Sequence, residues 1–378
     1  MELSMNDAVM NVQLSGIRRF TYLVRATPGA CALTIGEPDQ NTPDPIKEAA
    51  KAALDADDTH YPPGNGYPYL LEAISKFEAE QHGLHYAPDE IMVTVGATEA
   101  ISIAFHTLLN PGDEVIIPTP AFGLYEALVR LCRAVPVFLP TEVSGFQIDA
   151  GALASVLTPR TKAIVLTSPN NPTGCVYNRE TLGAVHALLK DRPVFVICDD
   201  VYRTLTYTED YHSFAEYTDM RDRIVVIQSF SKPYAMTGWR VGYVMADAAV
   251  KGRMEVVHQY AVTSVPAFIQ PACLKALETD TTPMVETFRR RRDYVFKRLM
   301  DMGLPIQEPQ GAFYVFVDLR KFGMDSVTFC ERMLKESLVG IIPGVYFGTE
   351  GFARLSYCYS DADLKEGLDR MERFIKGL

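Results

Sequence analysis

One lysine stands where an amine could do chemistry. Lys232 closely follows the apolar run IVVIQ in the stretch IVVIQSFSKPYAMTGWRVGY. A lysine at the end of a buried strand is either a solvated strand end or a reactive amine. An amine is nucleophilic only when neutral, so with an ordinary pKa of about 10.4 it must be desolvated to act near neutral pH. The groups around Lys232 therefore decide between the two interpretations.

Four further apolar runs end in polar or glycine-rich residues. They are GATEA after IMVTV, TPAFGLY after EVIIP, SPNNPTG after KAIVLT and DDVY after PVFVIC. In open parallel sheets, ligands bind beyond the carboxyl ends of the strands. Ala97 and Thr98 would open a helix there and offer backbone N–H groups to an anion. Ser229 and Arg240 could add further donors, although each motif taken alone is better explained as a cap, a turn or a strand end.

The same edge of the predicted sheet carries the groups that would bind a planar aromatic ring. Asp199 and Asp200 follow a buried strand, where an acid can face a cationic partner, and Phe122 offers an aromatic face. Asn171 supplies an amide and Tyr202 a phenol. Together with Lys232 and the anion-binding groups, these are the parts required to hold a phosphorylated, cationic, planar aromatic aldehyde. Pyridoxal 5′-phosphate fits that description.

The elements that must position these residues follow an alternating pattern. Seven strand-like runs, separated by helix-period segments, read IMVTV, EVIIP, VPVFLP, KAIVLT, PVFVIC, IVVIQ and VGYVM. Their continuous apolar character is typical of strands covered on both faces. After the first run, Ile101, Ala104, Phe105 and Leu108 fall on one face at helical spacing. The pattern predicts an α/β fold with a mostly parallel sheet.

The C-terminal part has a different order of predicted helices and strands. Two stretches mark predicted boundaries: GEPDQNTPDP, residues 36–45, which should be irregular, and the polar ETDTTPM, residues 278–284. Beyond the second lie a charged helix, strand-like AFYVFVDL and ARLSYCY, and an amphipathic helix. This pattern predicts a smaller α+β domain. We expect the arginine run 289–292 to coat a solvated helix face.

Composition excludes several classes of protein. The chain has 378 residues, 48% of them hydrophobic, and a net charge of −11, which disfavours nucleic acid as a partner. The N-terminal sequence lacks a targeting pattern, and no apolar run reaches the roughly 18 residues that span a membrane, so the predicted location is cytoplasmic. The seven cysteines are scattered and never form C-x-x-C pairs, which favours reduced thiols over disulfides and gives no sign of a metal site.

The ordered set of motifs resembles a known family. SFSKPYAMTGWRVGY, SPNNPTG, CDDVY and VGATEA together resemble the class I/II aminotransferases of fold type I, which depend on pyridoxal 5′-phosphate. The likeness extends over nearly all of the chain, through LTIGEPD, HYPPGNGYPYL, PQGAFYVF and ARLSY. It implies a large domain over residues 45–280 that carries a mostly parallel seven-stranded sheet. Residues 1–44 and 281–378 would form the small α+β domain.

The resemblance assigns roles around the cofactor ring. Lys232 would form the covalent link to the aldehyde, and Asp199 would pair with the pyridine nitrogen. Asn171 and Tyr202 would hydrogen-bond the ring oxygen, while Phe122 would stack on the ring face. Many relatives carry tyrosine or tryptophan in place of Phe122, so this chain keeps the stacking and loses a polar group.

The resemblance also places the phosphate. Ala97, Thr98 and Ser229 would bind it together with the guanidinium of Arg240, although glycine is common in relatives at position 97. Tyr61 resembles the tyrosine that reaches the phosphate of the neighbouring subunit's cofactor. The family therefore implies a homodimer with shared active sites.

For the substrate, Arg354 resembles the arginine that binds the α-carboxylate, with Asn171 and the backbone of Gly36 alongside. The alternative for Arg354 is an exposed strand arginine. We expect ping-pong transamination from an L-amino acid to a 2-oxo acid such as 2-oxoglutarate. The same machinery supports carbon–sulfur β-elimination, which is the alternative activity.

The side-chain pocket is not legible from the sequence. Arg18, Arg19, Tyr22 and His258 could each contact the distal group of the substrate, and each also has an ordinary structural explanation in a helix or loop. The two ends of the chain are most similar to the group of acetyl-diaminopimelate and aromatic aminotransferases.

Overall fold

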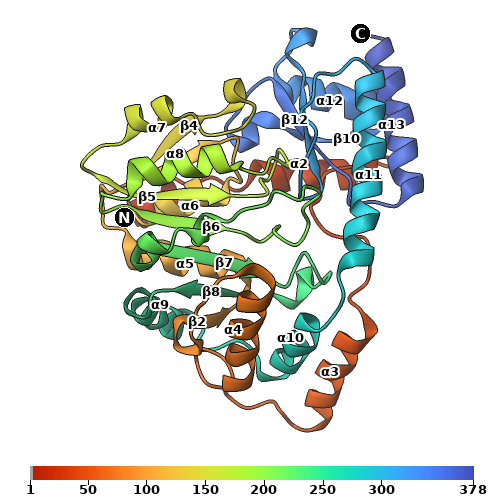
Figure 1. The fold of residues 1–378 in the computed structure, drawn as a ribbon. Helices are drawn as coiled ribbons and strands as arrows, with labels where there is room; N and C mark the ends of the chain where they lie inside the picture. Colours follow the sequence, from red (N-terminus) through yellow and green to blue (C-terminus); the bar gives the residue numbers. More distant parts are fainter. Residues whose placement is uncertain (1–2) are drawn as a thin grey trace.

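A seven-stranded sheet forms the centre of the protein in a computed structural model that describes residues 3–378 (Figure 1). The strand order is β2-β8-β7-β6-β5-β3-β4, and β8 runs antiparallel to the other six strands. The strands are β2 (Ile91–Thr94), β3 (Glu114–Thr119), β4 (Val135–Pro140), β5 (Thr161–Thr167), β6 (Phe195–Asp199), β7 (Ile224–Ser229) and β8 (Gly242–Ala246). The predicted α/β class and its mostly parallel sheet of seven strands are confirmed.

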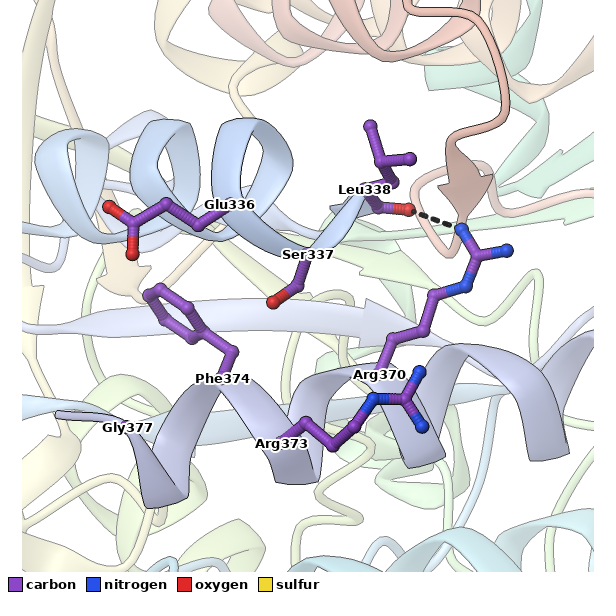
Figure 2. Close-up of a pocket in the computed structure, with 7 residues that line it drawn as sticks. All are labelled: Glu336, Ser337, Leu338, Arg370, Arg373, Phe374 and Gly377. Atoms are coloured by element: carbon purple, nitrogen blue, oxygen red, sulfur yellow. Dashed lines mark hydrogen bonds between the residues drawn. The ribbon is translucent and has the colours of Figure 1, made fainter.

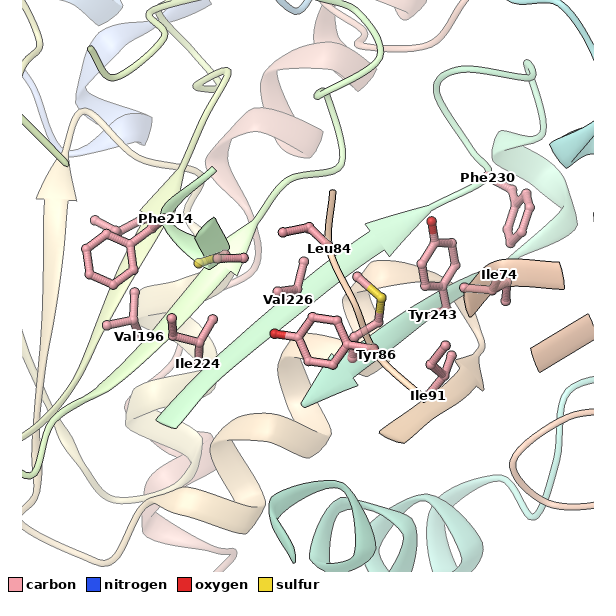
Figure 3. Packing of buried hydrophobic residues seen from close by; sticks show 14 of the residues in the cluster. Ile74, Leu84, Tyr86, Ile91, Val196, Phe214, Ile224, Val226, Phe230 and Tyr243 are labelled. Atoms are coloured by element: carbon pink, nitrogen blue, oxygen red, sulfur yellow. The ribbon is translucent and has the colours of Figure 1, made fainter. Parts of the chain in front are cut away.

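Helices cover both faces of this sheet, because successive strand residues point to opposite sides. Ile224 and Val226 of β7 pack against one layer, as Figure 3 shows, whereas Val225 packs against the other with Phe105. The first layer contains α3 (Asp44–Asp55), α4 (Pro68–His82), α7 (Ala150–Val156), α8 (Arg179–Leu189) and α10 (Gln270–Leu277). The second contains α5 (Gly96–Leu108), α6 (Leu124–Leu131) and α9 (Ala248–Ala261).

Strand β4 differs from the other predicted strands. It forms one edge of the sheet, and its Val135 and Phe138 are 41% and 42% exposed. The expectation that every run would be covered on both faces is wrong here, because of this strand only Leu139 is buried, whereas the opposite edge strand β2 is buried throughout. Within residues 3–378 we find no helix whose length and apolar content match those of a bilayer-spanning segment.

A second body of structure brings the two ends of the chain together. Its antiparallel sheet has the order β11-β12-β9, and β1 pairs with β10 in a short parallel sheet. Phe20 and Leu33 share its core with Phe316 and Leu368. The elements are α2 (Gly16–Ala26), β1 (Cys31–Ala32), α11 (Thr282–Asp301), β9 (Tyr314–Asp318), α12 (Ser326–Ser337), β10 (Val339–Gly340), β11 (Ile342–Pro343), β12 (Phe352–Ser356) and α13 (Asp361–Lys376), and α1 (Asp7–Met10) lies near α6. The boundaries 45–280, 1–44 and 281–378 stay a prediction.

Two helices begin earlier in the chain than the sequence predicted, so that each has a proline in its first turn. Pro45 is in the first turn of α3, which begins at Asp44, so the prediction of irregular structure over 36–45 is wrong at its end. Pro283 likewise lies in the first turn of α11. Proline is tolerated there because the first-turn N–H groups have no partner within the helix.

The arginine run of α11 is not uniformly solvated. Arg291 is 7% exposed and donates to both carboxylate oxygens of Asp39, at 2.7 and 2.8 Å, and to Asp361 at 3.0 Å. Arg292 is 9% exposed and donates to the carbonyl oxygen of Pro309. The predicted solvated face is therefore wrong for these two residues, because partners distant in the sequence cover them.

Truncation of Phe105 tests the packing of α5 on the sheet. Phe105 is fully buried, so Phe105→Ala should lower the free energy of unfolding by about 3–5 kcal/mol through lost burial and a residual cavity. Urea unfolding followed by circular dichroism measures the change. Val143→Ala, at a side chain that is 88% exposed, should stay within about 0.5 kcal/mol. Equal midpoints for the two variants would contradict the packing described.

Candidate active site

The carboxylate of Asp199 lies at the carboxyl end of β6 and is only half satisfied. The Tyr125 hydroxyl donates to Oδ2 at 2.6 Å and lies 2.8 Å from the Thr167 hydroxyl. Oδ1 is buried and has no hydrogen-bond partner among the described residues. Burial raises the pKa of Asp199 to about 6, although the Tyr125 hydrogen bond and the charge of Lys232 oppose the shift. A cationic N–H group would complete this site.

Lys232 lies just beyond β7 and is partly buried. Its ammonium donates to the carbonyl oxygen of Gly36 at 2.7 Å. Burial lowers the pKa of Lys232 to about 8, so its amine is neutral far more often than that of an ordinary lysine. Of the two interpretations of this lysine, the structure favours the reactive amine.

Gly36 permits a close approach of the N-terminal segment to the site. A Cβ atom at this position would lie 1.7 Å from the hydroxyl oxygen of Tyr314, so any larger residue would displace that ring. The Tyr314 hydroxyl lies 2.9 Å from the hydroxyl of Tyr202, and both side chains are buried. Gly36, Tyr202 and Lys232 are thus brought together, with Tyr314 as an additional member.

Arg354 is buried on β12, with 3% of its surface exposed. It donates to Asn171 Oδ1 at 2.8 Å and to the carbonyl oxygen of Thr34 at 2.5 Å, and its guanidinium lies 4.4 Å from the Tyr314 ring centroid and 4.9 Å from that of Phe347. Among residues 3–378 its Nε has no hydrogen-bond partner, and its guanidinium donates to an amide and a carbonyl oxygen and not to a carboxylate. The exposed-arginine alternative is therefore wrong. A buried cation without a counter-charge fits an anionic ligand.

A second cationic group faces the start of α5. Gly96 opens this helix with φ of +75°, and a Cβ atom there would lie 2.7 Å from Nη2 of Arg240. The guanidinium thus covers the helix N-terminus, where Ala97 is half-buried and Thr98 is exposed. A guanidinium beside free N–H groups is a suitable site for phosphate.

The remaining predicted residues lie at different distances from the start of α5. Ser229 pairs with Gly242 of β8, and a Cβ atom on Gly242 would lie 3.1 Å from the Ala97 nitrogen, so Ser229 is near the start of α5. Phe122 is partly buried and packs edge-on against Tyr125, with ring centroids 6.3 Å apart. Tyr61 is 90% exposed, and we find no contact between it and the other predicted residues in the described part of the chain.

The four residues that could contact the distal group of the substrate differ in burial. His258 is fully buried and lies against Glu99 and Gly64, so its side chain is not free to line a substrate pocket of its own subunit. Arg18, Arg19 and Tyr22 are exposed on α2.

Two residues of the site escaped the sequence analysis. Tyr125 lies in the motif TPAFGLY, three positions after Phe122, and Tyr314 lies in PQGAFYVF. The motifs were noticed, but the sequence analysis gave no role to these two phenols. A signal was available, because a tyrosine hydroxyl in a buried element needs a polar partner.

A surface hollow lies away from these residues. It has a volume of about 510 Å³ between the ends of α12 and α13 and is lined by Glu336, Ser337, Leu338, Arg370, Arg373, Phe374 and Gly377 (Figure 2). Arg370 already donates to the carbonyl oxygens of Gly29 and Leu338, at 2.8 and 3.3 Å. None of the predicted site residues borders this hollow, and we assign it no chemistry.

Comparison with known proteins decides the family. The family described as "Aminotransferase class I and II" matches residues 30–371. The chain belongs to this family. A Bacillus subtilis (strain 168) protein named "Probable N-acetyl-LL-diaminopimelate aminotransferase" is 42% identical over 99% of this chain and 96% of its own. The crystal structure of an aspartate aminotransferase from Thermotoga maritima covers 98% of this aminotransferase and 100% of its own chain, at 37% identity and a TM-score of 0.95. That of an aromatic aminotransferase from Pyrococcus horikoshii OT3 covers 96% and 99%, at 39% identity and a TM-score of 0.90.

These likenesses confirm the resemblance, the fold type I architecture and the enzymatic class. The chain is an aminotransferase, of a family that depends on pyridoxal 5′-phosphate. The residues present fit that group: the free Oδ1 of Asp199 suits a ring N–H, and Arg240 over the start of α5 suits a phosphate. The relatives are named for different amino acids, so they do not fix the amino donor of this aminotransferase.

The buried carboxylate gives this aminotransferase a testable pH dependence. Because the folded-state pKa of Asp199 is raised to about 6, its contribution to stability is complete below pH 4 and is lost as the pH rises through 6. In the cofactor-free protein, the free energy of unfolding of Asp199→Asn should therefore rise by about 1–3 kcal/mol relative to that of the wild type as the pH increases from 5 to 7.5. Urea midpoints at pH 5, 6 and 7.5 measure this gain.

Asp191→Asn is the matched control, since Asp191 is exposed and should show no such trend. A constant difference between Asp199→Asn and wild type across the three pH values would contradict the raised pKa.

Proposed function

We propose that this aminotransferase moves an amino group from an L-amino acid to a 2-oxo acid, with 2-oxoglutarate as acceptor, by a ping-pong mechanism at the site around Lys232. The observation that carries the proposal is a pair of buried, unmatched charges, the Asp199 carboxylate and the Arg354 guanidinium. Pyridoxal 5′-phosphate, when bound, supplies a ring that accepts the electrons of the bond broken at the substrate Cα.

The ring would be held by residues that end the central strands. Asp199 Oδ1 would accept from the ring N–H, and Tyr125 would fix the carboxylate through Oδ2. Asn171 and Tyr202 would hydrogen-bond the ring oxygen, and Phe122 would stack on the ring. An ionised Asp199 keeps the ring nitrogen protonated, because a carboxylate favours its cationic partner.

The phosphate would be bound at the start of α5. Ala97 and Thr98 would donate from the helix N-terminus, with Ser229 and Arg240 beside them. In the homodimer that the family implies, the partner subunit's Tyr61 would complete this site. The 90% exposure of Tyr61 leaves its phenol available to a second copy. The cytoplasm stays the predicted location.

Lys232 would hold the cofactor aldehyde at rest and then move a proton. With a pKa of about 8, about a tenth of its amine is neutral at pH 7, compared with less than about a thousandth for an unperturbed lysine. When its amine is free, Nζ would take the proton from the substrate Cα and would be the group that carries it through the transfer. The carbonyl oxygen of Gly36, 2.7 Å away, orients this amine.

Arg354 would bind the α-carboxylate that every amino acid substrate carries. Its side chain is already fixed by Asn171, the carbonyl oxygen of Thr34 and two aromatic rings, so little conformational entropy is lost when a carboxylate binds. The backbone of Gly36 lies on the same side of the site. With its carboxylate held there, a substrate would direct its Cα towards Lys232.

Lys232→Ala tests the assignment directly. We expect glutamate formation from 2-oxoglutarate and a panel of L-amino acids to fall by about 10³-fold or more, because the proton carrier is lost. Lys190→Ala, at an exposed lysine, should keep wild-type rates. Wild-type turnover by Lys232→Ala would overturn the proposal. Pyruvate release from cystathionine without any acceptor would instead support the carbon–sulfur lyase activity that the sequence left open.

A further inference from the structure

His258 of α9 forms a buried pair that the proposed mechanism does not use. The ring is fully buried, with Nδ1 2.7 Å from Glu99 Oε1 and Nε2 3.1 Å from the carbonyl oxygen of Gly64. A carbonyl oxygen only accepts, so Nε2 carries a proton and donates it. Without a proton between them, Nδ1 and Oε1 would both be acceptors at 2.7 Å, so we infer that the pair shares a second proton. Wherever that proton resides, the pair carries no net charge.

Glu99 stands beside the proposed phosphate-binding residues. It lies in the first turn of α5, directly after Ala97 and Thr98, and its Oε2 accepts the N–H of Val95 at 2.5 Å. A carboxylate at this point satisfies one free helix N–H group. Left without a counter-charge, it would also repel a phosphate bound at the same helix end.

The other charges near His258 are balanced among themselves. Lys251, which is 7% exposed, lies 3.3 Å from Glu255 one turn along α9. In the described part of the chain, His258 is the basic group within ion-pair distance of Glu99. The imidazole therefore balances the charge of Glu99, whereas the guanidinium of Arg240 at the same helix start has no carboxylate partner there among residues 3–378 and is left for the phosphate.

The same ring holds the loop that carries Tyr61. Its Nε2 hydrogen bond ends on Gly64, and the next residue, Asn65, accepts the backbone N–H of Val93 on β2 at 2.9 Å. The loop is thereby tied to the sheet and to α9 within two residues. His258 connects this loop to the first turn of α5.

We propose that His258 is a positioning residue for the cofactor phosphate: it neutralises Glu99 at the start of α5 and fixes the loop from which Tyr61 reaches the partner subunit. The inference rests on the proposed placement of the phosphate at Ala97 and Thr98. It assigns a role to a histidine that the sequence offered only as a candidate for the distal substrate pocket.

Binding of two vitamers to the full-length, cofactor-stripped dimer tests this role. Pyridoxal 5′-phosphate and pyridoxal differ only in the phosphate, and absorbance titration gives a Kd for each. His258→Gln should weaken binding of the phosphorylated vitamer about tenfold, because an unbalanced carboxylate then faces the phosphate. Binding of pyridoxal should stay within about twofold of wild type.

The double variant Glu99→Gln/His258→Gln separates electrostatics from folding. It removes both members of the pair and restores a net charge of zero, so it should regain most of the affinity for pyridoxal 5′-phosphate. Glu99→Gln alone should bind within about threefold of wild type, because a glutamine beside a neutral imidazole is also uncharged. An equal loss for both vitamers, or no recovery in the double variant, would overturn the inference.

Arg240→Gln distinguishes this inference from the function on which it rests. It should weaken binding of pyridoxal 5′-phosphate and spare pyridoxal. If Arg240→Gln leaves the Kd unchanged, the phosphate placement itself is wrong. If Arg240→Gln weakens binding and His258→Gln does not, only the role of His258 is wrong.

Discussion

The cost of burying a carboxylate at the end of β6 is the constraint on which the rest of the site depends. One oxygen of Asp199 is satisfied by Tyr125, and the other is not, so the folded chain holds the site ready for a cation. The central position of β6 in the sheet makes that oxygen rigid. The second body of structure contributes the opposite case, a buried Arg354 without a carboxylate. The charges of both groups act on Lys232, which suits an amine that changes its protonation state in the proposed reaction.

Strand ends could be predicted from the sequence because they follow from local pattern. Continuous apolar runs give the strands, and parallel strands bring their carboxyl ends to one edge. Even so, pattern alone could not choose between Asp199 and its neighbour Asp200, which is also buried and accepts a hydrogen bond from Ser213 at 2.6 Å. Successive strand residues face opposite ways, so only one of the two can meet the ligand, and the family resemblance made that choice.

What the sequence missed depends on partners far along the chain. Tyr314 meets Tyr202 across 112 positions, and His258 meets Glu99 across 159. Nothing near any of these residues signals the pairing. The buried Arg291 was misjudged for the same reason, since its partner Asp39 lies 252 positions away. The shared chemistry of amino acids is legible, because in the proposed function Arg354 and Lys232 act on groups common to all of them, whereas no motif marks the side chains that would select the donor.

Residues 36–39 connect the two bodies of structure mechanically, because Arg291 binds Asp39. At one end, Arg291 of α11 holds Asp39 by both carboxylate oxygens. At the other, the Gly36 carbonyl receives the amine of Lys232, and Glu37 receives the hydroxyl of Thr237. If α11 tilts relative to the central sheet, residues 36–39 must move with it. The tilt would then displace the Gly36 carbonyl oxygen that accepts the hydrogen bond of the Lys232 amine.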